Sequence, residues 1–199
     1  MRSAKRTAFS SGIVILLLAA SVVLGYLTDL LWTRWERQYY PVDFSNEVLS
    51  CAEQYDLDPF VIYALIKELS NFRSNYVSED NRIGLMQLSE ETFEQLTEDF
   101  LGENLNSGLL YEPATNIRYG SYYLLYLTTC YESQEAILAA YLCGREKVDN
   151  WYLAWEADAE SETTDFVIPD KKTQDKVLKI QRTIDKYKKL YDEKGDVLS

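Results

Sequence analysis

The sequence of 199 residues contains no histidine, the side chain that most often binds metals and acts as a general base near neutral pH. It also shows no metal-ligand cluster, no phosphate-binding loop and no nucleophile triad. We therefore expect neither a metal nor another cofactor, and any acid–base chemistry has to come from carboxyl groups.

Cysteine is scarce as well. The three cysteines, Cys51, Cys130 and Cys143, are an odd number, which excludes a complete disulfide framework but leaves room for one bridge. We expect all three to be small, buried, apolar side chains.

Positive charge is in deficit. The chain has 20 basic and 32 acidic residues and a formal net charge of −12. Arg2, Lys5 and Arg6 but only one acidic residue, Asp29, precede residue 33, so the remainder is more acidic still. This balance argues against nucleic acid as a partner and against docking onto anionic lipid or wall polymer by bulk charge.

One long apolar run lies near the N-terminus, at residues 12–32. About twenty helical residues, at ~1.5 Å each, span the ~30 Å hydrocarbon core of a bilayer. Three basic residues in segment 1–11 outnumber Arg34 and Arg37, which follow the run. The positive-inside rule then predicts a single-pass protein of the cell membrane, with a cytoplasmic N-terminus and an extracytoplasmic domain at 33–199.

A cleaved signal peptide is the alternative interpretation. Ala19 and Ser21 are small enough for a cleavage site, but apolar residues continue to Leu31, and no cysteine stands where a lipoprotein needs one. We therefore favour an uncleaved transmembrane anchor.

Beyond the anchor, helical periodicity and capping signals predict an all-α domain without strands or internal repeats. Ser45, Asp58, Ser89 and Ser133 are predicted N-caps, and Gly144 is a predicted helix stop. An acidic stretch at 156–165 is predicted to be a loop. The predicted helices cover residues 45–55, a segment from 59 to about 70, 89–100, 113–130, 134–143, 145–155 and a long segment after Pro169.

Several ordered motifs connect these helices to one family. The stretch from Ala64 to Leu88 reads ALIKELSNFRSNYVSEDNRIGLMQL. The motifs are Leu57-Asp58-Pro59, Ser70-Asn71-Phe72, Gly84-Leu85-Met86-Gln87, Tyr111-Glu112-Pro113 with Asn116-Ile117 and Gly120, Ala139-Ala140-Tyr141 with Gly144, and Ile168-Pro169 with Thr173. Together they resemble the soluble-lytic-transglycosylase (SLT) family, relatives of goose-type lysozyme, over roughly residues 40–191.

The resemblance implies an all-α, lysozyme-like SLT domain behind one N-terminal transmembrane helix. It also implies a chemistry. Members of this family cut the bond between N-acetylmuramic acid and N-acetylglucosamine in peptidoglycan, using one glutamic acid. Its proton goes to the leaving oxygen, and the carboxylate then takes the proton of the muramyl 6-hydroxyl, which closes a 1,6-anhydro ring.

The position of that glutamate holds leucine in this chain. The family glutamate lies eleven residues after the Asp of Asp-Pro and fifteen before the Gly of Gly-Leu-Met-Gln, and both counts arrive at Leu69. No catalytic residue of the family is therefore intact. Glu68 is the fallback acid, but successive helical residues point about 100° apart, so we expect Glu68 to be a solvated surface residue.

At the other positions of the family groove, some residues match the family pattern and others differ from it. By resemblance, Ser78, Met86, Gln87 and Tyr141 would line a glycan groove, whereas Ser70 and Asn116 are expected to be structural. Three positions have changed character: Leu69, Leu142 in place of an asparagine, and Lys172 in place of a glutamate. Asn81-Arg82-Ile83 also stands where the family favours small residues and glycine.

These departures favour a catalytically inactive member of the family, a pseudoenzyme of the cell wall. It would bind peptidoglycan glycan strands, or an envelope protein partner attracted by a more apolar groove. The alternative is a divergent lytic transglycosylase that uses Glu68, or Glu79 or Asp80 from the loop before Gly84. A third interpretation is a structural membrane protein whose groove is closed by side chains.

Overall fold

The computed structural model describes residues 2–100, 102–103, 105–157 and 166–192. The described chain is all-α, as predicted, and has isolated β-bridges at Val77–Ile83 and Ile83–Leu88 in place of strands. From residue 158 on, the predicted acidic loop lies outside the described residues. The elements are α1 (Arg2–Tyr39), α2 (Ser45–Tyr55), α3 (Pro59–Ser70), α4 (Glu90–Gln95), the π-helical turn η1 (Leu96–Phe100), the 3₁₀ turn η2 (Ser107–Tyr111), α5 (Pro113–Cys130), α6 (Gln134–Cys143), α7 (Arg145–Ala157), α8 (Lys171–Tyr187) and the π-helical turn η3 (Lys188–Asp192).

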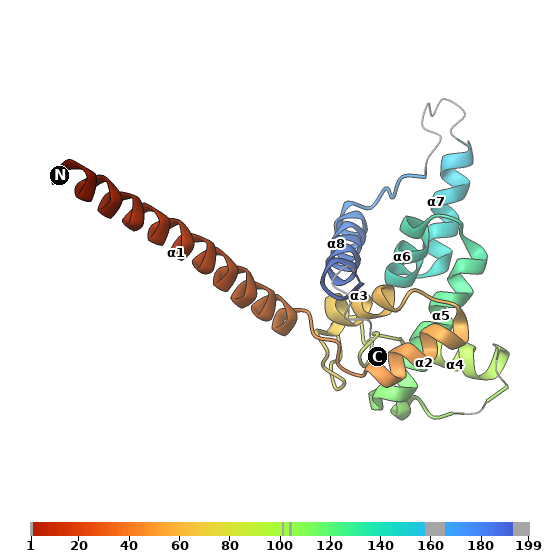
Figure 1. Ribbon diagram of the computed structural model, residues 1–199. Helices are drawn as coiled ribbons and strands as arrows, with labels where there is room; N and C mark the ends of the chain where they lie inside the picture. The colour runs from red at the N-terminus through yellow and green to blue at the C-terminus, as the bar shows by residue number, and fades with distance from the viewer. Residues whose placement is uncertain (1, 101, 104, 158–165, 193–199) are drawn as a thin grey trace. The chain divides into compact units, whose positions relative to one another are not determined.

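The chain divides into two compact units, residues 1–41 and 42–199. The first unit is α1, one continuous helix (Figure 1). By length and composition its segment Leu16–Tyr39 is able to cross a membrane, although a signal sequence passes the same test. The helix continues beyond residue 32, the predicted end of the membrane-spanning segment, and ends at Tyr39.

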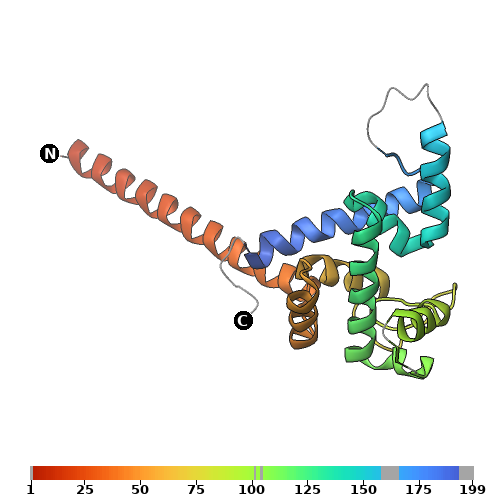
Figure 2. The same cartoon turned by 90° about the vertical axis from the view of Figure 1, so that its right-hand side faces the viewer.

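The second unit is a helical domain built around α3, α5 and α8. Helix α8 packs along α3 and also touches α6, while α5 packs against α2 and α6 (Figures 1 and 2). Helix α7 packs on α6. The segment between α3 and α4 has little regular structure, and it forms the floor of the site described below.

Local capping chemistry sets most helix starts. The side chains of Asp58, Ser89 and Ser133 each accept a hydrogen bond from a backbone N–H in the first turn, which confirms three predicted caps. The prediction for Ser45 was wrong. Ser45 is the first residue of α2, and Phe44 occupies the cap position in a left-handed conformation with no side-chain cap.

Helix α8 is amphipathic, and its apolar face is buried as the periodicity predicted. Val177, Ile180, Ile184 and Tyr187 are each at most 3% exposed. Its counterpart on α3 includes Tyr63, whose ring stacks on that of Tyr187 with 5.6 Å between centroids. This packing fixes α3, and so the family's catalytic-helix position, against α8.

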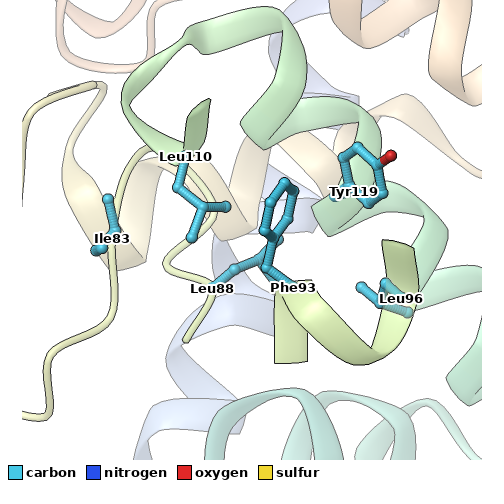
Figure 3. Close-up of a cluster of buried hydrophobic side chains, with 6 residues drawn as sticks. All are labelled: Ile83, Leu88, Phe93, Leu96, Leu110 and Tyr119. Carbon is cyan, nitrogen blue, oxygen red and sulfur yellow. The ribbon is translucent and has the colours of Figure 1, made fainter. Parts of the chain in front are cut away.

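A second cluster of buried side chains joins the segment that follows α3 to α4 and α5 (Figure 3). The ring of Phe93 packs edge-to-face on Tyr119, with 4.8 Å between centroids, and joins α4 to α5. Burying such large side chains stabilises a fold by about 1.5–3 kcal/mol each. The cluster consists of Ile83, Leu88, Phe93, Leu96, Leu110 and Tyr119.

The cysteine prediction was only partly right. All three cysteines are unpaired, but only Cys51 is buried, whereas Cys130 is exposed and Cys143 is half-buried. Cys130 ends α5 and Cys143 ends α6, and the last turn of a helix is commonly more accessible than its middle.

Candidate functional site

A cavity of about 300 Å³ opens between the C-terminal end of α3, the segment from Tyr76 to Gln87, the end of α6 and the face of α8. The structure brings seven of the candidate site residues predicted from the sequence into its lining. They are Glu68, Leu69, Ser78, Asp80, Gln87, Tyr141 and Leu142. The cavity therefore lies where the family resemblance placed a glycan groove.

Two leucines occupy positions that the motif spacing predicts to be altered from the family pattern. Leu69, on the last turn of α3, and Leu142, on the last turn of α6, are both half-buried in the cavity lining. Neither side chain can give or take a proton. The cavity remains open with both leucines in its lining, so the interpretation of a groove closed by side chains is not supported.

Glu68 does not point into solvent, so our expectation of a solvated surface residue was wrong. Its side chain is only 11% exposed because α8 packs along this side of α3. Thr183 donates a hydrogen bond to Oε1 at 2.8 Å, and Lys179 Nζ lies 2.6 Å from Oε2. Burial lowers the pKa of the neighbouring Lys67, although the charge of Glu68 opposes that effect.

Gln87 and Tyr141 form the polar floor of the cavity. Gln87 has a positive φ of 56° and is 3% exposed, and its side-chain amide donates to the carbonyls of Tyr76 and Gly84 at 3.0 and 2.7 Å. Tyr141 donates its hydroxyl proton to the carbonyl of Met86 at 3.0 Å. Burial raises the pKa of Tyr141, so this hydroxyl stays protonated in the physiological range.

Met86 and Lys172 were also predicted as groove positions, but they are not among the described residues that line the cavity. Met86 is fully buried, and its sulfur accepts a hydrogen bond from Ser121 of α5 at 3.9 Å. Lys172 is exposed on the first turn of α8. Ser78 lies in the lining, where its hydroxyl accepts a hydrogen bond from the N–H of Arg82 at 3.1 Å.

Ser70 and Asn116 are structural, as predicted. Ser70 is buried and donates to the carbonyl of Ile66. Asn116 is fully buried, accepts from the N–H of Met86 at 2.7 Å and donates to the carbonyls of Ile83 and Leu110 at 2.9 Å. It thereby fixes the floor segment to the start of α5.

Sequence reasoning did not place several other residues in the lining. Tyr76 and Arg82 come from the floor segment, and Lys176, Lys179 and Ile180 come from α8. The departure at Arg82 was visible in the sequence, but no local signal places α8 against the cavity. Glu79 and Asp80, the other candidate acids, are both exposed, and Asp80 lines the cavity.

Among the described residues, no group of three or more cysteine, aspartate or glutamate side chains is arranged to hold a metal ion. Chemically the lining contains a serine hydroxyl, a glutamine amide, two tyrosines and five charged side chains, of which Glu68 and Lys179 form an ion pair. These groups suit the hydrogen-bonding groups of a polar ligand.

This helical, lysozyme-like architecture is shared with known proteins. The model of the Transglycosylase SLT domain matches residues 48–163, more than half of the chain, and the protein belongs to the SLT family.

The fold is similar to that of two bacterial enzymes. The 70-kDa soluble lytic transglycosylase from Escherichia coli has 24% identity and a TM-score of 0.67 over 77% of this chain. An inactive mutant of the lytic transglycosylase Slt from Pseudomonas aeruginosa has 24% identity and a TM-score of 0.64 over 76% of it. This chain covers 25% of the length of each. The likeness therefore concerns one domain of much longer proteins.

Proposed function

We propose that this protein is a membrane-anchored, extracytoplasmic SLT domain that binds peptidoglycan glycan strands without cutting them. The observation that carries the proposal is the pair of residues at the end of α3. By the motif spacing Leu69 takes the predicted glutamate position, and both carboxylate oxygens of Glu68 already have partners on α8.

The expected chemistry needs a carboxyl group that starts protonated and later takes up a proton. Both oxygens of Glu68 instead act as acceptors toward α8, one for the Thr183 hydroxyl and the other in the ion pair with Lys179. The loss of general acid–base assistance lowers rates by about 10²–10⁴. The Pseudomonas relative is described as inactive when a single glutamate is replaced by glutamine.

The cavity lining supports a glycan rather than an apolar protein segment as the ligand. Leu69, Leu142 and Ile180 are its only aliphatic side chains among the described residues, and the other lining residues are charged, amide, hydroxyl or tyrosine side chains. Tyrosine rings and polar groups together are common in sites for polar ligands. The predicted shift to a more apolar groove, and with it an envelope protein partner, has less support.

The membrane anchor rests on α1. Its segment Leu16–Tyr39 is long and apolar enough to span a bilayer, and its large apolar side chains are exposed in the isolated chain. With a cytoplasmic N-terminus, the SLT domain would be outside the cell membrane, where peptidoglycan is.

A digest and a binding assay on the same protein test this proposal. Full-length protein in detergent micelles is incubated with purified peptidoglycan, the soluble products are analysed by mass spectrometry for 1,6-anhydro ends, and the pellet is analysed for bound protein. We expect binding without anhydro products. Leu142→Trp should fill the cavity and reduce binding at least about fivefold, whereas Leu153→Trp, at an exposed site on α7, should bind as the wild type does.

A divergent active enzyme is the second candidate, and the place of Glu68 in the cavity lining favours it. If the wild type releases anhydro products and Glu68→Gln abolishes them, the non-catalytic proposal is wrong. If only Leu69→Glu releases them, the groove still orients its substrate and lacks only the acid.

A further inference from the structure

Arg82 places a positive charge inside the cavity without a carboxylate to balance it. It is half-buried, and its Nη1 donates to the backbone carbonyls of Tyr141 at 3.1 Å and Gln87 at 3.5 Å. Throughout the described residues it forms no ion pair. By contrast, Arg118 and Arg145 pair with Glu103 and Asp149 at 2.8 and 3.0 Å.

Helix α8 adds two more cations to the same cavity. Lys179 pairs with Glu68, but Lys176 is exposed and makes no ion pair with any residue that the structure describes. The remaining carboxylate of the lining, Asp80, is exposed at its edge. Three cations against two carboxylates leave the cavity positive in a chain whose net charge is −12.

This local excess of positive charge favours an anionic ligand. A guanidinium held partly away from water is stabilised by an acceptor that carries negative charge, and arginine binds carboxylates through two parallel hydrogen bonds. The backbone contacts of Arg82 fix its position before any ligand arrives, so little ordering is required when one binds.

We propose that Arg82, together with Lys176 of the same cavity lining, makes the cavity selective for glycans that carry a carboxylate. This inference rests on the proposed glycan-binding function and names the ligand group that the cavity distinguishes. Two sources of that group exist in peptidoglycan. One is the lactyl carboxylate of muramic acid without its peptide, and the other is the set of carboxylates of an attached stem peptide.

Affinity measurements with four hexasaccharides and the full-length protein in detergent micelles test the inference. The probes are neutral chitohexaose, a peptide-free muramic acid–glucosamine glycan, the same glycan with its carboxylates reduced to alcohols, and a glycan with stem peptides. We expect at least one carboxylate-bearing glycan to bind about tenfold more tightly than chitohexaose and the reduced glycan, as one charge-assisted bond predicts. Whichever of the two binds better identifies the source of the carboxylate.

Matched charge variants identify the cationic side chain that binds the ligand carboxylate. Arg82→Gln and Lys176→Gln should each reduce the preference, the former to less than threefold, while Lys172→Gln removes a charge from α8 outside the cavity and should leave it unchanged. Because Arg82 also contacts backbone carbonyls, Arg82→Gln can disturb the floor segment. The reduced glycan tests the same bond on the unmodified protein.

The outcomes separate the two proposals. Equal affinity for all four probes overturns the carboxylate inference and leaves glycan binding intact, whereas no affinity for any probe contradicts the proposed function itself. An equal loss in Lys172→Gln, or an undiminished preference in Arg82→Gln and Lys176→Gln, also overturns the inference, because either result assigns the selectivity to charges outside the cavity.

Discussion

The side chain of Asn116 connects backbone groups of the cavity floor that lie far apart in the sequence. Its oxygen and its amide nitrogen together make three hydrogen bonds to backbone groups in the segment from Ile83 to Leu110. All of these groups are remote from water because Asn116 is fully buried. Buried polar groups that lose their partner destabilise a fold by about 1–3 kcal/mol each.

We therefore expect Asn116→Ala to lower the free energy of unfolding by about 3 kcal/mol and to loosen the floor segment. Denaturant titration would measure the change, and hydrogen exchange at the N–H of Met86 would locate it. Asn150→Ala, at an exposed position on α7, is the matched control and should change stability by less than about 0.5 kcal/mol. A change as small for Asn116→Ala would contradict the bridging role.

Individual residues also show which parts of the site could be predicted from the sequence. The motif pattern identified Asn116 as structural, and it placed Gln87 and Tyr141 at a cavity where the structure has them. It could not predict the burial of Glu68, because the partner Lys179 lies on α8, more than a hundred residues further along the chain.

At the scale of elements, the contact between α5 and the floor segment depends on a residue without a side chain. A Cβ added at Gly120 would lie 2.5 Å from the sulfur of Met86, 2.7 Å from its Cβ and 3.0 Å from the hydroxyl of Tyr141. Gly120 therefore allows α5 to approach both residues closely.

Gly120→Ala should destabilise the protein by about 1–3 kcal/mol through overpacking, despite the better helix propensity of alanine. It should also weaken glycan binding, because Met86 and Tyr141 join the floor to α6. Thermal unfolding and the peptidoglycan pellet assay would measure the two effects. An unchanged melting temperature would mean that α5 shifts without penalty.

The control for this prediction is Gly25→Ala on α1, which adds the same methyl group where nothing lies within 4 Å. It should leave the melting temperature of the SLT domain and peptidoglycan binding unchanged.

Helix boundaries were predictable where they are set by residues that lie next to them in the sequence. The caps at Asp58, Ser89 and Ser133 are local hydrogen bonds, so the sequence pattern was sufficient to place them. The left-handed Phe44 before α2 has no such local signal. The place of α8 beside the cavity is set by packing over the whole domain, so its lysines were missed as site residues.

At the scale of the whole molecule, the lack of histidine shapes how stability depends on pH. Histidine is the side chain whose ordinary pKa lies nearest to 6.5, and the chain has none. The hydrogen bond from Tyr119, helped by Arg118, holds the pKa of the Glu103 carboxyl below its ordinary value. Thr173 does the same for Asp170, the N-cap of α8.

A carboxyl group whose pKa is lower in the folded than in the unfolded protein stabilises the fold fully at pH values above its unfolded-state pKa. This stabilisation decreases as the pH falls below the unfolded-state pKa, and it is lost once the pH is below the folded-state pKa. We expect the melting temperature to be nearly constant from pH 6 to 8 and to fall below about pH 4.5. In Glu103→Gln the melting temperature should fall less at acidic pH than in the wild type. The corresponding difference in the free energy of unfolding is at most about 1 kcal/mol, because the Glu103 side chain is partly exposed.

Calorimetry over this pH series would check the prediction, with Glu94→Gln, at an exposed site on α4, as the control. A fall in the melting temperature between pH 6 and 8, or an equal acid-side fall in Glu103→Gln and the wild type, would contradict it.

If the protein binds glycan strands without cutting them, as proposed, the engagement of Glu68 by Lys179 and Thr183 has a kinetic consequence. A lysozyme-like groove that cuts its strand is vacated by turnover, but one without a usable acid is vacated only when the strand dissociates. Residence time then replaces turnover as the quantity that governs its action. A glycan strand repeats the same disaccharide along its length, so a groove that releases one repeat can rebind the next before the strand diffuses away. Strand length, more than the affinity for one repeat, would then determine how long the protein is held at the wall.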